Sequence, residues 1–310
     1  MLIFRRRRSI SHPQSADNRY DVLLELGRVG GGFNAGIAVV KRKSDRLICI
    51  RKRLVPGQLS TPRHWNREAD IMRKLRGHRN ICSFIEANIA PGRAELYLEY
   101  CKMGTVHDFM LYMKNRRLVV PEGFVWHLLH DLTSALGWMH DGFARPDDML
   151  NSATKRVQGW MPVIHRDIKP DNCFLQTQTC PYNPYPIVKL GDFGLAINKV
   201  DISSLSNTSR GVCAPGWFPP EYPLCGERSD VYRTAAIAQL LCLPHWALGI
   251  GTQISSHYSQ GLSGCIQAGM QRNINERPFA RDFYRFIDHL DDANRALVPV
   301  PNDAFKVLQL

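Results

Sequence analysis

The segment from Val163 to Leu175, VIHRDIKPDNCFL, constrains the fold of this chain more than any other stretch. Its apolar ends are typical of short buried strands, and Pro170 prevents the polar turn between them from continuing as a helix or a sheet ladder. The turn concentrates polar and ionisable side chains: His165, Arg166, Asp167, Lys169, Asp171 and Asn172. A plain surface loop would not need apolar anchors on both sides, so we expect a polar turn set into a core.

Hydrophobic periodicity predicts that the first third of the chain is rich in strands. Strands are expected over residues 20–27, 37–40, 47–54, 81–87 and 95–100. Between them, apolar residues at helical spacing predict a helix over 64–75. A small sheet with one helix is the expected architecture of this part.

Beyond residue 103 the pattern becomes mostly helical. A continuous apolar stripe predicts a buried helix over 122–140, and a second helix is expected over 283–290. The stretch 141–162 is polar and contains proline and glycine. A loop of that length inside a compact domain is either specialised or mobile.

A second motif follows the polar turn. The stretch KLGDFGL at 189–195 is an apolar strand that ends in Asp192, an acid between glycines. A D-F-G motif alone is a weak signal of function. Here, however, it is preceded by H-R-D-x-K-x-x-N and followed by Pro219-Pro220-Glu221. In this combination the chain resembles the eukaryotic-type protein kinase catalytic domain over about residues 20 to 290. The residues around the motifs are similar to those of fungal kinases of the serine/threonine class.

The resemblance implies an α+β fold with two lobes. A small N-lobe of antiparallel strands with one helix would cover residues 20–101, and a larger, mostly helical C-lobe would cover 102–290. Residues 1–19, which contain the basic run from Arg5 to Arg8, are expected to form a flexible tail, and 291–310 a C-terminal tail. This division agrees with the strand-rich and helix-rich halves of the hydrophobic pattern.

The resemblance also assigns roles within the two motifs. Asp167 would accept the proton of the substrate hydroxyl, and Lys169 would neutralise the phosphate in transfer. Asn172 and Asp192 would hold Mg²⁺ through oxygen ligands. Arg166 would pair with a phosphorylated residue of the activation segment, whose hydroxyl cluster lies at 203–209. His165 is interpreted as a packed structural histidine.

The first part of the chain contains a candidate cation for the nucleotide. The strand period of two places Ile48, Ile50 and Lys52 on one face of the third strand. Glu68 interrupts the apolar stripe of its helix. Two lone charges on inward faces are costly unless they pair, so we predict a Lys52–Glu68 ion pair that orients Lys52 on the phosphates. Two alternatives stay open: each side chain reaches solvent, or Arg51 is the functional cation.

The glycine cluster fits the family spacing as Gly30-x-Gly32-x-x-Ala35-x-Ile37, with Ile37 over the base. Ala35 departs from the pattern, because a Cβ there limits backbone approach to the phosphates. The stretch LYLEYC at 96–101 resembles the hinge whose backbone binds the adenine edge. The nucleotide-contacting residues predicted are Gly30, Gly32, Ile37, Ile50, Lys52, Glu68, Glu99 and Cys101.

Two further matches and two departures concern the second part of the chain. By resemblance, Glu221 and Arg277 form a structural pair, and Asp230 braces the catalytic loop. Ala214 stands where serine/threonine kinases usually have a threonine, so a hydroxyl expected near Asp167 is missing. The stretch from Asp230 to Ala235 also lacks a glycine common after this motif.

Composition excludes several classes. The 40 Lys and Arg against 28 Asp and Glu give a net charge of +12, but no basic blocks interleaved with aromatic residues are present, so no nucleic-acid partner is expected. The nine cysteines contain no C-x-x-C pair, which suggests neither a zinc site nor a disulfide framework. With no apolar stretch of transmembrane length, a cytoplasmic or nuclear protein is expected.

The activity that the resemblance implies is transfer of the γ-phosphate of ATP, with Mg²⁺, to Ser/Thr hydroxyls of protein substrates. Lys169, two residues after Asp167, favours serine and threonine over tyrosine. The alternative is a pseudokinase that acts as a binding scaffold. Ala35 and Ala214 motivate it, whereas the intact Lys52 and the acids of both motifs oppose it. Small-molecule kinases generally lack D-F-G with a downstream P-P-E.

Overall fold

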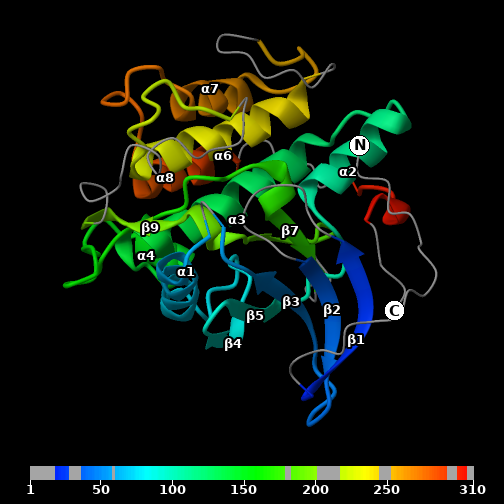
Figure 1. The fold of residues 1–310 in the computed structure, drawn as a ribbon. Helices are drawn as coiled ribbons and strands as arrows, with labels where there is room; N and C mark the ends of the chain where they lie inside the picture. The colour runs from blue at the N-terminus through cyan, green and yellow to red at the C-terminus, as the bar shows by residue number, and fades with distance from the viewer. Residues whose placement is uncertain are drawn as a thin grey trace. The chain divides into compact units, whose positions relative to one another are not determined.

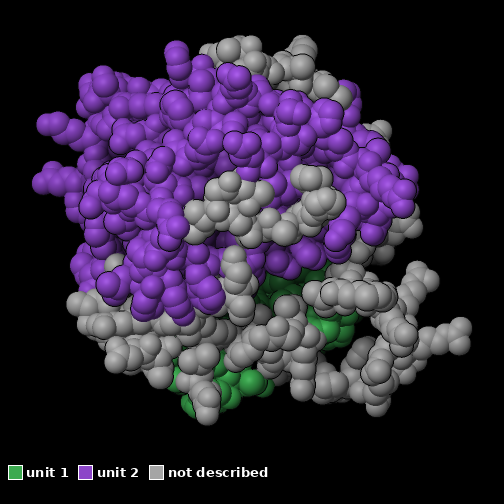
Figure 2. Space-filling view, turned by 90° about the horizontal axis from the view of Figure 1, so that it is seen from above, with its two compact units in different colours: residues 1–73, 83–100, 309–310 green, residues 74–82, 101–308 purple. Residues whose placement is uncertain are grey.

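The computed structural model describes residues 18–27, 36–57, 60–178, 183–200, 217–243, 253–291 and 299–305. The chain divides into two compact units, coloured separately in Figure 2. The first comprises residues 1–73, 83–100 and 309–310, and the second comprises 74–82 and 101–308.

The first unit is built on a five-stranded antiparallel sheet (Figure 1). Its strands are β1 (Tyr20–Gly27), β2 (Gly36–Arg42), β3 (Ile48–Leu54), β4 (Phe84–Ala90) and β5 (Arg93–Glu99), in the spatial order β1-β2-β3-β5-β4. Helix α1 (Pro62–Lys74) buries Trp65, Ala69, Ile71 and Met72 along one stripe. This is the sheet with one helix that the hydrophobic pattern predicts.

One face of the sheet carries a cluster of buried residues: Tyr20, Ala38, Val40, Cys49 and Tyr97. The Tyr20 ring stacks on Tyr97 at 4.1 Å between ring centroids, and Tyr20 Oη donates to Glu86 Oε1 at 3.0 Å. Tyr20 lies on β1 and Glu86 on β4, the two edges of the sheet. Because their side chains meet over one face, the sheet is strongly twisted and curled.

The second unit is mostly helical. Its helices are α2 (Val106–Asn115), α3 (Glu122–Asp141), α4 (Pro146–Leu150), α6 (Glu227–Cys242), α7 (Gln260–Gly269) and α8 (Ala280–Asp291). Helix α3 packs against both α6 and α8, and most of its residues are buried (Figure 1). Helix α2 begins with a capping box in which Thr105 and Asp108 each bond the other's backbone N–H.

Two short antiparallel pairs lie in the second unit. β6 (Val163–Ile164) pairs with β9 (Ile197–Asn198), and β7 (Cys173–Gln176) pairs with β8 (Ile187–Leu190). Single turns of 3₁₀-helix, η1 (Pro170–Asn172) and η2 (Phe193–Leu195), follow β6 and β8, and a third, η4 (Asn302–Ala304), lies near the end of the described chain. The polar turn of the sequence therefore lies between β6 and β7, as predicted.

Two boundaries differ from those expected. The predicted strand at 81–87 is wrong at its start, since β4 begins at Phe84. Ile81 bridges Leu190 and the Cys82 N–H donates to Leu190 O, so these apolar residues pair with β8. The helix expected at 64–75 begins two residues earlier, because Pro62 has a φ suited to the first helical position and no N–H to leave unbonded.

The stretch 141–162 is ordered and includes α4. Met149 of α4 is fully buried in a cluster with Phe143 and Tyr284, and the guanidinium of Arg285 donates to Met149 O at 2.8 Å. This stretch is therefore part of the core of the second unit. Across the residues that the structure describes, no helix combines the length and apolar character needed to cross a membrane.

Candidate active site

The turn between β6 and β7 holds three of the predicted side chains together. Lys169 Nζ lies 2.7 Å from Asp167 Oδ2, and Asn172 Nδ2 donates to the same oxygen at 2.9 Å. A second bond of 2.8 Å joins Asn172 Nδ2 to Asp167 O. The other carboxylate oxygen, Asp167 Oδ1, is buried and has no hydrogen-bond partner among the described residues. It is therefore an acceptor that a substrate proton donor could satisfy.

Asp192 is brought to the same end of the β7–β8 pair. Cys173 pairs with Leu190, so the residues just before β7 and just after β8 are neighbours. Gly191 N donates to Asn172 O at 2.9 Å, which fixes this approach. Asp192 is half-buried and has a positive φ of 58°, a conformation that few residues other than glycine adopt.

The orientation of Asn172 suits a metal ligand. Both of its side-chain hydrogen bonds come from Nδ2, and within the described part of the chain nothing donates to Oδ1. An amide oxygen and the nearby Asp192 carboxylate are hard oxygen donors, which match Mg²⁺. These residues fit the metal that the sequence predicts.

His165 has the structural role that the sequence predicts. Its Nδ1 accepts from Asp167 N at 3.2 Å, so the neutral ring carries its proton on Nε2, which lies 3.1 Å from the Gly191 carbonyl. The ring also contacts Phe193 edge-on. Complete burial lowers the pKa of His165, which keeps the imidazole neutral. His165 thus links the catalytic turn to the strand end that carries Asp192.

Asp230 braces the same turn from α6. Its carboxylate accepts from His165 N at 2.8 Å and from Arg166 N at 3.1 Å, and His140 Nε2 lies 3.3 Å away. Burial opposes ionisation of Asp230, but the bond from His140 and the nearby cations outweigh it and hold its pKa below the usual value. The backbone entering Asp167 is therefore held by a charged acceptor.

Arg166 lies at the beginning of this turn with a φ of 72°, and its Nη1 donates to Leu195 O at 3.4 Å. The hydroxyl cluster at 203–209 and Ala214 lie outside the described residues. The predicted pairing of Arg166 with a phosphorylated residue of that segment therefore stays a prediction.

In the first unit, Lys52 and Glu68 form the expected ion pair. Lys52 Nζ lies 2.7 Å from Glu68 Oε1, and each side chain is 5% exposed. Arg51 points to the other face of β3, where its Nη2 lies 3.3 Å from Glu25 Oε1. Of the two cations, Lys52 is therefore the one that α1 orients.

Of the remaining residues predicted to contact the nucleotide, Ile37 and Ile50 lie within the described part of the chain. Ile37 pairs with Lys52 across β2 and β3, and Ile50, which pairs with Val39, lies two residues before Lys52 on the same face. Gly30 and Gly32 lie outside the described residues.

The predicted hinge residues can be described separately. Glu99 ends β5, and its carboxylate accepts from Ser83 N at 2.9 Å. Cys101 is buried with its thiol 3.8 Å from that of Cys82.

The sequence matches the protein kinase domain over residues 20–250. The chain belongs to the protein kinase domain family. The predicted resemblance and the α+β kinase fold are thereby confirmed.

Curated relatives of this kinase domain are serine/threonine kinases, fungal ones among them. The G2-specific protein kinase nimA of Emericella nidulans is 32% identical over 292 residues, which cover 84% of this chain and 40% of that protein. The serine/threonine-protein kinase Nek2 of Mus musculus is 29% identical, with coverages of 88% and 54%. The G2-specific protein kinase nim-1 of Neurospora crassa is 30% identical, with coverages of 85% and 32%. The chain thus spans about a third to a half of the length of these relatives.

The kinase domain also contains the expected pair of Glu221 and Arg277. Arg277, fully buried, contacts both oxygens of Glu221, at 2.8 Å and 3.1 Å. Burial opposes ionisation of Glu221, but Arg277 and Ser229 more than compensate and lower its pKa below the usual value.

The sequence did not predict the contacts of Arg156 or of Arg233 in the kinase domain. Arg156, in the stretch 141–162, bonds Asp141 and Glu227, and Lys199 takes the second oxygen of Glu227 at 2.7 Å. Arg233 is fully buried inside α6. The sequence signal for Arg233 is a charge that interrupts the mostly apolar stretch 231–242, but its acceptors cannot be identified from the sequence.

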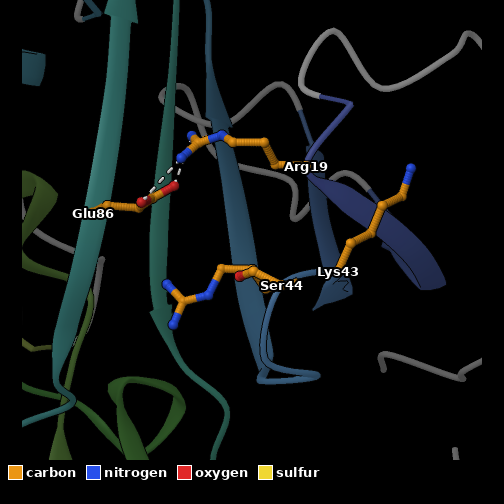
Figure 3. A pocket seen from close by; sticks show the side chains of 5 residues that line it. Arg19, Lys43, Ser44 and Glu86 are labelled. Atoms are coloured by element: carbon orange, nitrogen blue, oxygen red, sulfur yellow. Dashed lines mark hydrogen bonds and ion pairs between the residues drawn. The ribbon is translucent and has the colours of Figure 1, made fainter.

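A hollow of about 530 Å³ lies on the first unit of the kinase domain, lined by Arg19, Arg42, Lys43, Ser44 and Glu86 (Figure 3). It contains none of the predicted site residues. Arg19 pairs with Glu86 at 2.8 Å, and Lys43 points away from that pair (Figure 3). Arg42 pairs with Asp45 and lowers the pKa of that carboxyl to about 2. Lys43 Nζ lies 3.5 Å from Asp21 Oδ1, so each cation of the hollow has an acidic neighbour.

Proposed function

We propose that this kinase domain transfers the γ-phosphate of ATP to Ser/Thr hydroxyl groups of protein substrates, with Mg²⁺. The observation that carries the proposal is the environment of Asp167. One carboxylate oxygen is held by Lys169 and Asn172, and the other is buried and unbonded among the described residues. A buried acceptor without a donor is retained at a cost to stability, which a role in proton transfer accounts for.

Three residues of the turn, Asp167, Lys169 and Asn172, then have tasks in the reaction. Asp167 Oδ1 accepts the proton of the attacking hydroxyl as the oxygen approaches phosphorus. Lys169 stabilises negative charge on the transferred phosphoryl group. The bonds from Asn172 to Asp167 hold the carboxylate in one orientation, so little reorganisation is needed when the substrate arrives.

The second unit contains the proposed metal ligands. Asn172 and Asp192 would hold Mg²⁺, which neutralises phosphate charge when bound. In the first unit, Glu68 orients Lys52, whose ammonium would bind the phosphates. Ile37 and Ile50, which flank Lys52 on the same sheet face, would contact the base.

Protein substrates are the proposed partners, and the cytosol or nucleus is the proposed compartment. The described cysteines are all free and buried, as expected in a reducing environment.

A comparison of wild type with Asp167→Asn tests the proposal directly. The assay uses radiolabelled ATP, Mg²⁺ and a generic basic protein as substrate. The variant should lower kcat by about 10²–10⁴-fold, because the hydroxyl loses its proton acceptor. Asp171→Asn, an exposed acid of the same turn, is the matched control and should stay near wild type. Equal activity of wild type and Asp167→Asn would refute the proposal, and no activity in either would favour the binding scaffold.

A further inference from the structure

A charged side chain lies inside the most buried helix of the second unit. Arg233 of α6 has no exposed surface, and its helical neighbours Val231, Ala235 and Ile237 are buried apolar residues. Removing a guanidinium from water is costly unless ion pairs and hydrogen bonds replace its hydration. An apolar side chain of similar volume would fill this space without that cost, so packing alone does not account for an arginine here.

The guanidinium of Arg233 contacts acceptors on two parts of the chain. Nε donates to Trp217 O at 3.2 Å, and Nη2 donates to Cys225 Sγ at 3.4 Å. Nη1 lies 3.7 Å from Asp230 Oδ1, one turn earlier on α6. Trp217 and Cys225 lie on either side of Glu221. Arg233 therefore ties both ends of the stretch 217–225 to the helix that carries Asp230.

Asp230 extends this connection to the catalytic turn. Its two oxygens accept from the backbone N–H groups of His165 and Arg166, the residues directly before Asp167. A continuous series of contacts thus runs from Trp217 through Arg233 and Asp230 to the backbone that carries the proposed proton acceptor. The participating side chains, Arg233 and Asp230, are both 0% exposed, so water does not compete for their contacts.

We propose that Arg233 is a positioning residue for phosphoryl transfer. It holds Asp230 and the stretch 217–225 in one arrangement, and through Asp230 it fixes the orientation of the turn that carries Asp167. The inference rests on the proposed function. Arg233 contacts no reacting group, so its effect is on geometry, and a displacement of about 1 Å at a reacting group can cost roughly 10²-fold in rate.

The test uses the full chain with Arg233→Met, Arg233→Lys and the control Arg228→Met. Arg228 is on the same helix and donates to Ile274 O at 3.0 Å, away from the series of contacts described above. Initial rates with a generic basic protein give kcat and the KM for ATP, and thermal melts give the folded fraction used to normalise kcat. Amide hydrogen exchange of peptides covering residues 163–175 reports the order of the turn independently of activity.

Arg233→Met should lower kcat by about 10- to 100-fold, whereas the KM for ATP stays within about twofold. Arg233→Lys should fall between Met and wild type, because an ammonium keeps the charge beside Asp230 but lacks the fork that reaches both other acceptors. Exchange of the amides of His165 and Arg166 should accelerate in Arg233→Met. Arg228→Met should change none of these quantities.

The proposal is overturned if Arg233→Met keeps kcat and exchange at wild-type levels, if Arg228→Met shows the same losses, or if kcat falls only together with a rise in the KM for ATP. Where Arg233→Met does not fold, Arg233→Lys decides: a lower kcat at unchanged KM supports the proposal, and wild-type kcat overturns it. An inactive wild type would count against the proposed function, and the exchange of the 163–175 amides would then still decide whether Arg233 positions the turn.

Discussion

Lys52 Nζ of β3 lies 2.7 Å from Glu68 Oε1 of α1, and only 5% of each side chain is exposed. Neither charge could stay ionised in such surroundings at low cost without the other. The pair therefore fixes the position of a cation beside Ile37 and Ile50, on one face of the first unit's sheet.

Breaking this pair should destabilise the protein. Glu68→Ala should lower the free energy of unfolding by about 3–5 kcal/mol, because it removes one side chain of a buried ion pair. The KM for ATP should rise as well. Asp70→Ala is the matched control on α1, since Asp70 is 71% exposed and paired with Arg73; an exposed pair of this kind contributes about 0.2–1 kcal/mol. Urea unfolding measures the free energy of unfolding of both variants. Equal losses of stability in Glu68→Ala and Asp70→Ala would contradict the assignment of a buried ion pair.

Nucleotide binding should depend on Mg²⁺ through Asn172 and Asp192. ATP should raise the Tm of the wild type only when Mg²⁺ is present, because phosphates cannot sit beside Asp167 and Asp192 without a cation. The shift should shrink in Asn172→Ala and in Asp192→Asn, and it should persist in Asp171→Asn. A shift that is indifferent to Mg²⁺ would show that these residues do not bind the metal.

The Glu221–Arg277 pair should make the free energy of unfolding depend on pH in the acidic range. The pKa of Glu221 is lowered from its ordinary value of 4.5, so its stabilisation is present above about pH 4.5 and is lost as the pH falls toward the folded-state pKa. Glu221→Gln should therefore be less stable than wild type at pH 7, and the difference should narrow at lower pH. Denaturant titrations at several pH values measure this. A difference that is constant with pH would contradict it.

Helix α4 should contribute to the core of the second unit. Met149→Ala should cost about 2–5 kcal/mol, because it leaves a cavity beside Phe143 and Tyr284. The next residue, Leu150, is 39% exposed, and Leu150→Ala should cost much less, about 0.5–1 kcal/mol. Comparable small losses would mean that this stretch folds independently of the core.

Local patterns predicted the strands of the first unit and its ion pair, because the strand period and the helix period each place a charge on an apolar face. Ile81 and Cys82 show where such patterns fail. They continue the apolar run of β4 in the sequence, yet they pair with Leu190 of β8. Periodicity reports that a residue is buried, whereas the partner strand depends on contacts distant in the chain.

Asp167, Lys169, Asn172 and Asp192 could be predicted as site residues from the sequence alone, because they lie in two short motifs that carry the family resemblance. Arg233 could not. In the sequence it is the charge in the mostly apolar stretch 231–242, and its long side chain could equally reach solvent. Only the tertiary structure identified its acceptors. A backbone carbonyl and a thiol from 217–225 contact Arg233 because the chain packs that stretch against α6, and no local sequence pattern predicts this packing.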